Sequence, residues 1–427
     1  MLPVYYEDRL VGRIEESGVG FSFAYASEWL TASDSFPISL TMPLRAEPYS
    51  AGVATPWFAN LLPEDRLLEQ VGRLLGRSQA DVYGLLEEMG GETAGALSIG
   101  VPEPVDHADY RELNETELAE TIQRLPARPL LVGEEDITMS LAGAQTKLAV
   151  AVFDQRINLP LRGAASTHIL KPESERLYAA VENELLCMNL AAKVGLTVAS
   201  TTMGVAKGKR YLLVERYDRH VRDQRSVWRG HQEDFCQALG FYPTQKYEAR
   251  RGPGLSALFQ TIDKHVRRSA RDRLALLDLI IFGFCIGDTD RHAKNYSLIL
   301  TDGGPRLAPG YDFLSALQYE GITRNIAMRI AGKNRAEYLE RRHWERFAQD
   351  VRLSPAATVN RVEALARAVS DQVHGVADQL AGRFPANAEA LQLFSKGISE
   401  RAARIMTNSK RGPAAATGGI SESETEA

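Results

Sequence analysis

Cysteine is scarce in this sequence of 427 residues, and neither sign of charge prevails. The three cysteines, Cys187, Cys236 and Cys285, lie about fifty residues apart in apolar runs, so they form neither a metal-ligand spacing nor a disulfide framework. Fifty basic against fifty-five acidic side chains give a formal charge of −5, which alone favours neither nucleic acid nor membrane as a partner. We therefore expect a cytoplasmic protein in a reducing compartment.

A long hydrophobic run is also missing. The longest apolar stretch, Leu274–Ile286, has 13 residues and contains Asp278, whereas a membrane span needs about 20. The first residues, MLPVYYEDRLVG, lack the basic start and apolar segment of a signal peptide. We expect no membrane association and a buried core helix at 274–286. Hydrophobic residues at 44% and charged residues at 25% are typical of a globular protein, and the length predicts about two or three domains.

Changes of pattern along the chain predict an α+β protein in four parts. Residues 1–103 form a small α+β unit that ends in a linker at Val101–His107. Residues 104–225 are rich in strands, and residues 226–406 are mostly helical, with one hairpin at Ser297–Leu300 and Arg306–Ala308. Residues 407–427 have almost nothing to bury and are expected to be disordered. A sheet-rich lobe followed by a helical lobe predicts a binding cleft between them.

The most specific motif is GDTDRHAKN at 287–295, which follows the apolar helix and precedes the hairpin; Tyr311 and Asp312 come after the hairpin. Phosphoryl transfer from ATP needs one carboxylate that receives the attacking hydroxyl and two oxygen ligands for magnesium. Asp290 and Asn295 are five residues apart on one loop, and the hairpin can return Asp312 to the same place. This is the arrangement of a protein-kinase-like catalytic core. His292 in the same loop is expected to pack against the core.

A second signal is Lys171 at the end of a predicted strand, with Glu184 on the next helix. Kinases hold ATP phosphates with a strand lysine that is steadied by a helical glutamate. Glu182 is a rival partner, because the sequence does not fix the phase of this helix.

Two further segments are less specific. The small residues of SLAGAQTK at 140–147 open into a strand, where backbone N–H groups can approach phosphate oxygens. They match neither a Walker A nor a GxGxxG pattern, and a plain turn is the alternative. The segment at 215–217 follows the last predicted strand, where a kinase offers backbone groups to adenine.

Taken in order, the segments SLAGAQTK, THILKP, VENELLCMNLA, VERYDR, HQEDFCQALG, GDTDRHAKN, APGYDFLS and MRIAGK resemble the HipA-like serine/threonine kinase toxins. The N-terminal segments WL, FPISLTMPL, WFANLLPE and LLEQV are similar to the small domain that precedes the kinase core in that family. The resemblance extends from about residue 2 to the 350s. It implies a two-lobed, protein-kinase-like core preceded by an N-terminal α+β subdomain.

The resemblance also implies function. It implies a serine/threonine-protein kinase that uses ATP and Mg²⁺, is the toxin of a toxin–antitoxin pair, and arrests growth by phosphorylating an aminoacyl-tRNA synthetase. The implied partner is a helix-turn-helix antitoxin of the HipB type, which connects the toxin to operator DNA.

The implied site residues carry over position by position. Asp290 is the catalytic base, Asn295 and Asp312 are the magnesium ligands, and Glu184 is the partner of Lys171. Ser140 is the autophosphorylated serine, whose modification switches the kinase off. The implied ATP-binding residues are Ala142, Gly143, Ala144, Gln145, Thr146, Lys147, Lys171, Glu215, Arg216, Tyr217, His292, Ala293, Lys294, Asn295, Tyr311 and Asp312.

Two positions depart from the family pattern. Asp288 stands where an asparagine is expected, which adds either a metal-binding carboxylate or a loop cap, and Ala331 replaces a glycine. Two other functions stay open: a small-molecule kinase on the same core, and a co-repressor that holds an antitoxin on DNA. Under the second, the basic stretches Lys264–Arg273 and Lys333–Arg346 would contact phosphates.

Overall fold

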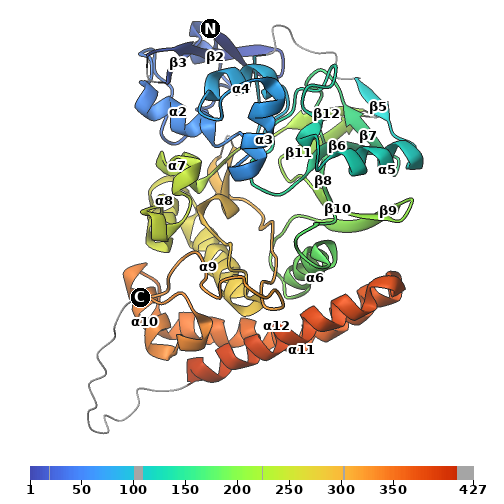
Figure 1. Cartoon of the computed structure of the whole chain (residues 1–427). Coiled ribbons are helices and arrows are strands. Elements are labelled where there is room, and N and C mark those ends of the chain that lie inside the picture. Colours follow the sequence, from blue (N-terminus) through green and yellow to red (C-terminus); the bar gives the residue numbers. More distant parts are fainter. Residues whose placement is uncertain (19, 101–108, 224, 302, 411–427) are drawn as a thin grey trace.

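The computed structural model describes residues 1–18, 20–100, 109–223, 225–301 and 303–410. Figure 1 shows the N-terminal unit in blue beside a strand-rich lobe in green, with the helical lobe in orange and red below them. The predicted linker Val101–His107 lies outside the described residues. None of the helices in the described ranges is long and apolar enough to cross a membrane.

The N-terminal unit contains an antiparallel sheet with the strand order β3-β2-β1-β4. Phe21, Phe23 and Tyr25 alternate with half-buried small residues, so the three aromatic rings enter the core from one face of β3. The elements of this unit are β1 (Leu2–Tyr6), β2 (Arg9–Glu16), β3 (Phe21–Tyr25), α1 (Ser27–Thr31), α2 (Ala51–Ala59), α3 (Asp65–Leu75), α4 (Val82–Met89) and β4 (Leu97–Ile99).

The strand-rich lobe has a six-stranded antiparallel sheet with the order β5-β7-β6-β8-β10-β9. Asn114 caps α5 in a reciprocal capping box with Glu117, as their spacing predicts. The elements are β5 (Tyr110–Glu112), α5 (Glu115–Arg124), β6 (Leu148–Phe153), β7 (Arg156–Pro160), β8 (His168–Pro172), α6 (Ala180–Lys193), β9 (Thr201–Ala206) and β10 (Lys209–Glu215).

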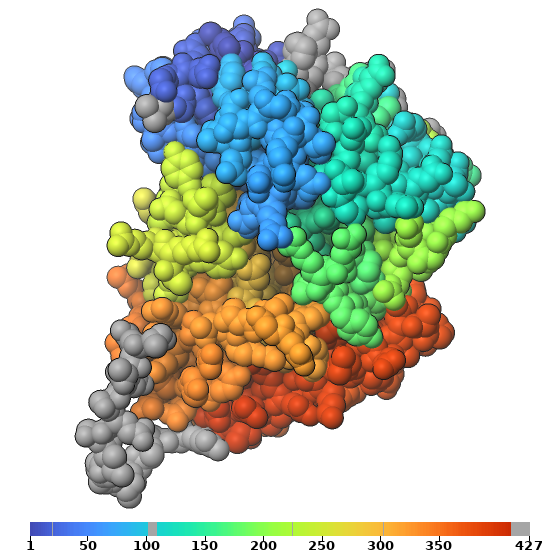
Figure 2. Space-filling view, viewed as in Figure 1, coloured from blue at the N-terminus to red at the C-terminus, as the bar shows by residue number. Residues whose placement is uncertain are grey.

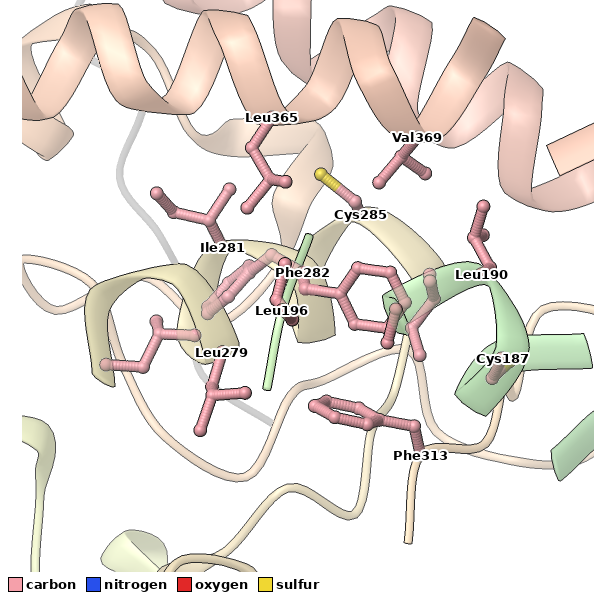
Figure 3. Packing of buried hydrophobic residues seen from close by; sticks show 14 of the residues in the cluster. Cys187, Leu190, Leu196, Leu279, Ile281, Phe282, Cys285, Phe313, Leu365 and Val369 are labelled. Carbon is pink, nitrogen blue, oxygen red and sulfur yellow. The ribbon is translucent and has the colours of Figure 1, made fainter. Parts of the chain in front are cut away.

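The helical lobe is built around α9, the predicted apolar helix. Asp278, the one charge in the apolar run, is exposed enough to bind Arg361 of α11 through two contacts of 2.6 Å. Ile281 and Cys285 point toward Leu365 and Val369, and Phe282 lies edge-on to Phe313, in the core of this lobe (Figure 3). The elements are α7 (Phe235–Leu239), α8 (Leu255–His265), α9 (Ser269–Ile286), β14 (Ser297–Thr301), β15 (Gly304–Leu307), α10 (Arg341–Asp350), α11 (Pro355–Arg383) and α12 (Ala388–Lys410). All three cysteines are free thiols and buried.

Two predictions for this half of the chain were wrong. Residues after Ser226 include further strands: β12 (Ser226–Arg229) pairs with β11 (Arg219–Asp223), and β13 (His231–Asp234) adds a third strand to the hairpin. β13 has no apolar alternation because its buried side chains are polar and bind groups of the N-terminal unit. Residues 407–410 of the predicted tail are helical, since α12 continues to Lys410 with Asn408 and Ser409 buried, and the rest of that tail lies outside the described residues.

One hydrophobic cluster joins the N-terminal unit to the strand-rich lobe. It includes Val4 and Trp57 from the first unit and Leu148, Leu170 and Leu213 from β6, β8 and β10. Burying apolar surface from both units in one core fixes the N-terminal unit against the kinase-like part.

Candidate active site

A cleft of about 1080 Å³ lies where the three parts of the chain meet. The hollow at the centre of Figure 2 is bordered by the blue α3, the green segment before α6 and the orange segment at 322–334. Most of the residues that the sequence assigns to ATP line this cleft: Ala142, Gly143, Ala144, Gln145, Thr146, Lys147, Lys171, Glu215, Arg216, Tyr217, His292, Lys294, Asn295, Tyr311 and Asp312. The predicted base, Asp290, also lines it, whereas Ser140, Glu184 and Ala293 are buried behind its wall.

The loop that carries Asp290 begins at a glycine with a left-handed backbone. Gly287 ends α9 with φ +72°, and a Cβ at this position would lie 2.6 Å from a methyl carbon of Leu317. The carboxylate of Asp288 accepts the backbone N–H of Asp290 at 3.2 Å and pairs with Arg291 at 3.1 Å. Asp288 is therefore a loop cap, which decides between the two roles that the sequence leaves open.

Arg291 joins the two chain segments on which the predicted metal ligands lie. Its guanidinium donates to the backbone oxygens of Asn295 and Tyr311 at 2.9 Å and lies 3.6 Å from the ring centre of Phe313. The side chain is buried, so these hydrogen bonds satisfy it away from water. Arg291 was not among the predicted site residues, although its place directly after Asp290 in the motif was a usable signal.

Asp290 is exposed in the cleft, and its carboxylate accepts a hydrogen bond of 2.7 Å from the hydroxyl of Tyr247. Its backbone oxygen accepts the side-chain N–H of Asn295 at 2.9 Å. His292 packs edge-on against the Tyr247 ring, and burial, with the nearby Lys246 charge, lowers its pKa to about 3. The sequence predicts that His292 packs against the core, and the side chain is buried as expected. Tyr247 was missed, because nothing in its local sequence marks it.

Lys171 on β8 lies between two carboxylates. Its ammonium is 2.6 Å from Glu184 of α6 and 2.5 Å from Asp312. Burial disfavours a charge on either Lys171 or Asp312, but their attraction prevails, so the pKa of Lys171 is raised and that of Asp312 is held well below its usual value. Glu182, the rival partner, faces Arg210 and Asn387 instead.

The loop at 142–147 lies over this cluster, with Gly143 at φ +104°. Lys147 donates to the backbone oxygen of Ala142, and Gly143 accepts the backbone N–H of Glu64 at 3.2 Å, which ties the loop to the start of α3. Burial, with the neighbouring charge of Lys171, lowers the pKa of Lys147 to about 8.

Ser140 is fully buried just before this loop. Its hydroxyl donates to the backbone oxygen of Leu61 at 2.8 Å, and its N–H donates to that of Glu92 at 2.8 Å. In this conformation the hydroxyl faces the N-terminal unit and cannot reach Asp290.

The N-terminal unit supplies acidic groups to both lobes. Glu64 lies 2.5 Å from Lys246 and 3.7 Å from Lys294, whose ammonium is also bound by Asn60 and Asp234 at 2.7 Å. The side chain of Lys294, assigned to ATP by the resemblance, is thus committed to these protein groups.

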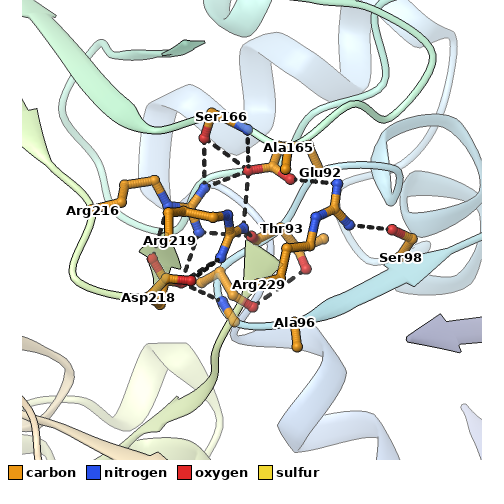
Figure 4. A network of polar contacts seen from close by, with 12 residues as sticks. Glu92, Thr93, Ala96, Ser98, Ala165, Ser166, Arg216, Asp218, Arg219 and Arg229 are labelled. Carbon is orange, nitrogen blue, oxygen red and sulfur yellow. Dashed lines mark hydrogen bonds and ion pairs between the residues drawn. The ribbon is translucent and has the colours of Figure 1, made fainter. Parts of the chain in front are cut away.

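Glu92 forms the second polar contact between the units, drawn in Figure 4. It accepts from Arg216 at 2.6 Å and Arg219 at 3.0 Å, and it pairs with Arg229 at 2.8 Å. Asp218 binds the first two arginines as well. Arg216 belongs to the predicted adenine segment, and its side chain serves this network while Glu215 and Tyr217 flank it.

The oxygen donors of the cleft fit a magnesium ion better than a soft metal. The amide nitrogen of Asn295 is used by Asp290, and within the described part of the chain nothing bonds its side-chain oxygen. Asp312 offers a carboxylate that is partly exposed to the cleft. Magnesium prefers such oxygen ligands and completes its shell with phosphate and water. Elsewhere in the described ranges, no cluster of three histidines, cysteines or carboxylates is suited to a metal.

Comparisons with known proteins agree with the resemblance and confirm the fold. The family model described as HipA-like C-terminal domain matches residues 139–374, and that described as HipA N-terminal domain matches residues 2–100. Over 409 residues the chain is 37% identical to the "Putative kinase Y4mE" of Sinorhizobium fredii, covering 90% of this chain and 97% of that protein.

A toxin of Shewanella oneidensis and a solved complex from the same organism are also similar. The chain is 29% identical to its serine/threonine-protein kinase toxin HipA, over 77% of this chain and 78% of the toxin. A solved complex of HipA, HipB and operator DNA from strain MR-1 contains a chain that superimposes with a TM-score of 0.84 at 25% identity, covering 96% of this chain and 98% of that one. The two-lobed, kinase-like fold with its N-terminal subdomain is that of this toxin.

Proposed function

Because the chain belongs to the HipA-like serine/threonine-protein kinase toxins, we propose that it transfers the γ-phosphate of ATP, with Mg²⁺, to a serine or threonine of a translation protein. An aminoacyl-tRNA synthetase is the proposed target, and growth arrest is the proposed consequence. The observation that carries the proposal is the cleft itself, which brings together Lys171 from β8, Asp290 and Asn295 from one loop, and Asp312 from the segment after β15.

Each side chain has a role that its contacts support. Asp290 accepts the proton of the attacking hydroxyl, and Lys171, held by Glu184, neutralises phosphate charge. Magnesium held by Asn295 and Asp312 would offset the negative charge of the phosphates. The loop at 142–147 covers the phosphates with backbone N–H groups, and the segment at 215–217 borders the adenine. Arg291 keeps the loop of Asp290 against Tyr311, so the base and both ligands move as one unit.

Labelled ATP and cell extract test the proposal directly. The wild-type protein should label a protein band, and Asp290→Asn should lower that labelling by about 10² to 10⁴, the usual contribution of a general base. Asp371→Asn, an exposed carboxylate on α11, is the matched control and should label normally. Unchanged labelling by Asp290→Asn would remove the base assignment, and label found only in small solutes would favour a small-molecule kinase.

We also propose that phosphorylation of Ser140 switches the kinase off. The buried site beside Leu61 has no room for a phosphate of about −1.5 to −2 charges, so the modified segment must leave and carry the loop at 142–147 with it. Ser140→Asp should bind ATP at least tenfold more weakly than Ser140→Ala in a calorimetric titration. Equal affinities of the two variants would contradict the switch.

The proposed partner is a helix-turn-helix antitoxin that connects the protein to operator DNA, as the HipA–HipB–DNA complex of the Shewanella relative suggests. Co-purification with a co-expressed antitoxin tests this. Asp290→Asn should retain the antitoxin, because the base lies inside the cleft. If wild type and Asp290→Asn repress equally but neither labels protein, the co-repressor alternative is favoured.

A further inference from the structure

Tyr247 is the side chain that holds the carboxylate of Asp290. Its hydroxyl is 2.7 Å from Oδ1 of Asp290, and the residue lies on the loop between α7 and α8. No other side-chain hydrogen bond reaches this carboxylate from the described residues. Burial, and then the charge of Asp290, raises the pKa of Tyr247, so the phenol stays protonated and donates.

The Tyr247 ring is itself fixed from several sides. His292 packs edge-on at 5.0 Å and 82°, while the charged groups of Lys246 and Arg250 lie 5.3 and 5.4 Å from the ring centre. Lys246 in turn is held by Glu64 of the N-terminal unit at 2.5 Å. A continuous set of contacts therefore runs from the N-terminal unit to the cleft.

An aspartate that removes a proton must present one oxygen to the acceptor hydroxyl within about 3 Å and in line. A carboxylate on a single Cβ–Cγ bond turns freely unless one oxygen is held. Tyr247 holds Oδ1, which leaves Oδ2 for the acceptor. From this geometry we propose that Tyr247 is a positioning residue for phosphoryl transfer, acting through Asp290 and supported by Glu64 of the N-terminal unit through Lys246. This inference rests on the proposed function.

Tyr247→Phe is the appropriate variant, because it removes the hydroxyl and keeps the ring packed. The variant loses a hydrogen bond to a charged group, and this loss costs enough free energy that the rate of protein phosphorylation at saturating ATP should fall about tenfold or more. The affinity for ATP should be unchanged in a calorimetric titration, since Tyr247 contacts the base and not the phosphate-binding lysine. Tyr338→Phe, an exposed tyrosine outside the cleft, is the matched control and should behave as wild type.

A double-mutant cycle separates positioning from general structural support. In single-turnover assays, Tyr247→Phe should slow the wild type about tenfold and should have no further effect in the Asp290→Asn background. Equal slowing in both backgrounds, or a wild-type rate for Tyr247→Phe, would overturn the inference. A normal rate for Asp290→Asn would also overturn it, because Tyr247 is proposed to act through Asp290. If the wild type phosphorylates no protein at all, the proposed function fails instead, so the two failures are distinguishable.

Discussion

Asp288 illustrates how a single buried carboxyl group responds to its surroundings. Its side chain is 3% exposed and bonds to Arg291 and to the backbone of Asp290, so it shapes the loop. Burial raises the pKa of Asp288 to about 7, although Arg291 opposes this shift. The sequence marked this position as unusual, but only the contacts assign it as a cap.

The raised pKa predicts how stability depends on pH. The folded state binds a proton at Asp288 more tightly than the unfolded state, so this contribution to stability is full below about pH 4 and is lost as pH rises through 7. Asp288→Asn keeps an oxygen that can accept the N–H of Asp290 but does not titrate. Chemical denaturation at pH 5 and pH 8 should show a smaller loss of stability for Asp288→Asn than for wild type. Equal losses would show that Asp288 does not titrate in this range.

Residue-level prediction from the sequence worked where a side chain's role is set by its neighbours in the chain. Lys171, Asp290, Asn295 and Asp312 share one cleft because strand, helix and hairpin lengths return them there. Tyr247 could not be predicted, since its partner is 43 residues away and only the packed loops bring them together.

At the scale of elements, the end of α9 sets where the loop of Asp290 begins. Gly287 combines a left-handed backbone with a close approach to Leu317. Gly76, at the end of α3, has a similar φ of +65° but nothing within 4 Å of an added Cβ. Comparing substitutions at these two glycines therefore distinguishes the cost of the left-handed backbone from the cost of steric overlap.

Gly287→Ala should therefore lower the free energy of unfolding more than Gly76→Ala does. The left-handed conformation costs an alanine about 1–2 kcal/mol at either position. Overlap with Leu317 adds about 1–3 kcal/mol at position 287. Urea denaturation of both variants checks the difference, and labelling should fall only for Gly287→Ala. Equal losses of stability would mean that Leu317 moves aside without cost.

Elements with a clear apolar pattern were predicted close to where they lie: the core helix expected at 274–286 is the later part of α9, and the predicted hairpin strands are β14 and β15. β13 was missed for a physical reason. His231 and Glu233 are buried and bind the N-terminal unit, Glu233 through Ser39 and Trp57, so the strand looks polar in sequence. A pattern that relies on hydrophobicity cannot detect a strand whose buried face is satisfied by hydrogen bonds.

At the scale of the whole molecule, the N-terminal unit is part of the active cleft rather than an appendage. It shares a hydrophobic core with the strand-rich lobe, and Glu64 and Glu92 neutralise lysines and arginines of both lobes. The sequence predicted a boundary for the unit but gave no sign of these contacts, because each joins residues more than 100 positions apart.

Glu92→Gln tests whether the cleft depends on these contacts from the N-terminal unit. Removing the charge leaves Arg216 and Arg219 buried with Asp218 as their remaining carboxylate and takes from Arg229 its ion pair with Glu92. Breaking a buried ion pair costs about 3–5 kcal/mol. Denaturation should show a loss of that size, and ATP affinity should fall because Arg216 lies in the adenine segment. Glu87→Gln, whose partner Arg77 is at the surface, should change stability by less than about 1 kcal/mol. A similarly small change in stability for Glu92→Gln would show that this contact of the N-terminal unit does not stabilise the cleft.

In this mechanism Asn295 and Asp312 are proposed to hold one magnesium ion against the phosphates of a nucleotide that Lys171 also contacts. Calorimetric titration with a non-hydrolysable ATP analogue, with and without Mg²⁺, tests it most directly. For the wild type we predict binding that Mg²⁺ tightens at least tenfold, and for Asp312→Asn we predict that this gain disappears. Wild-type affinity that is the same with and without Mg²⁺, or an undiminished gain in Asp312→Asn, would contradict the account.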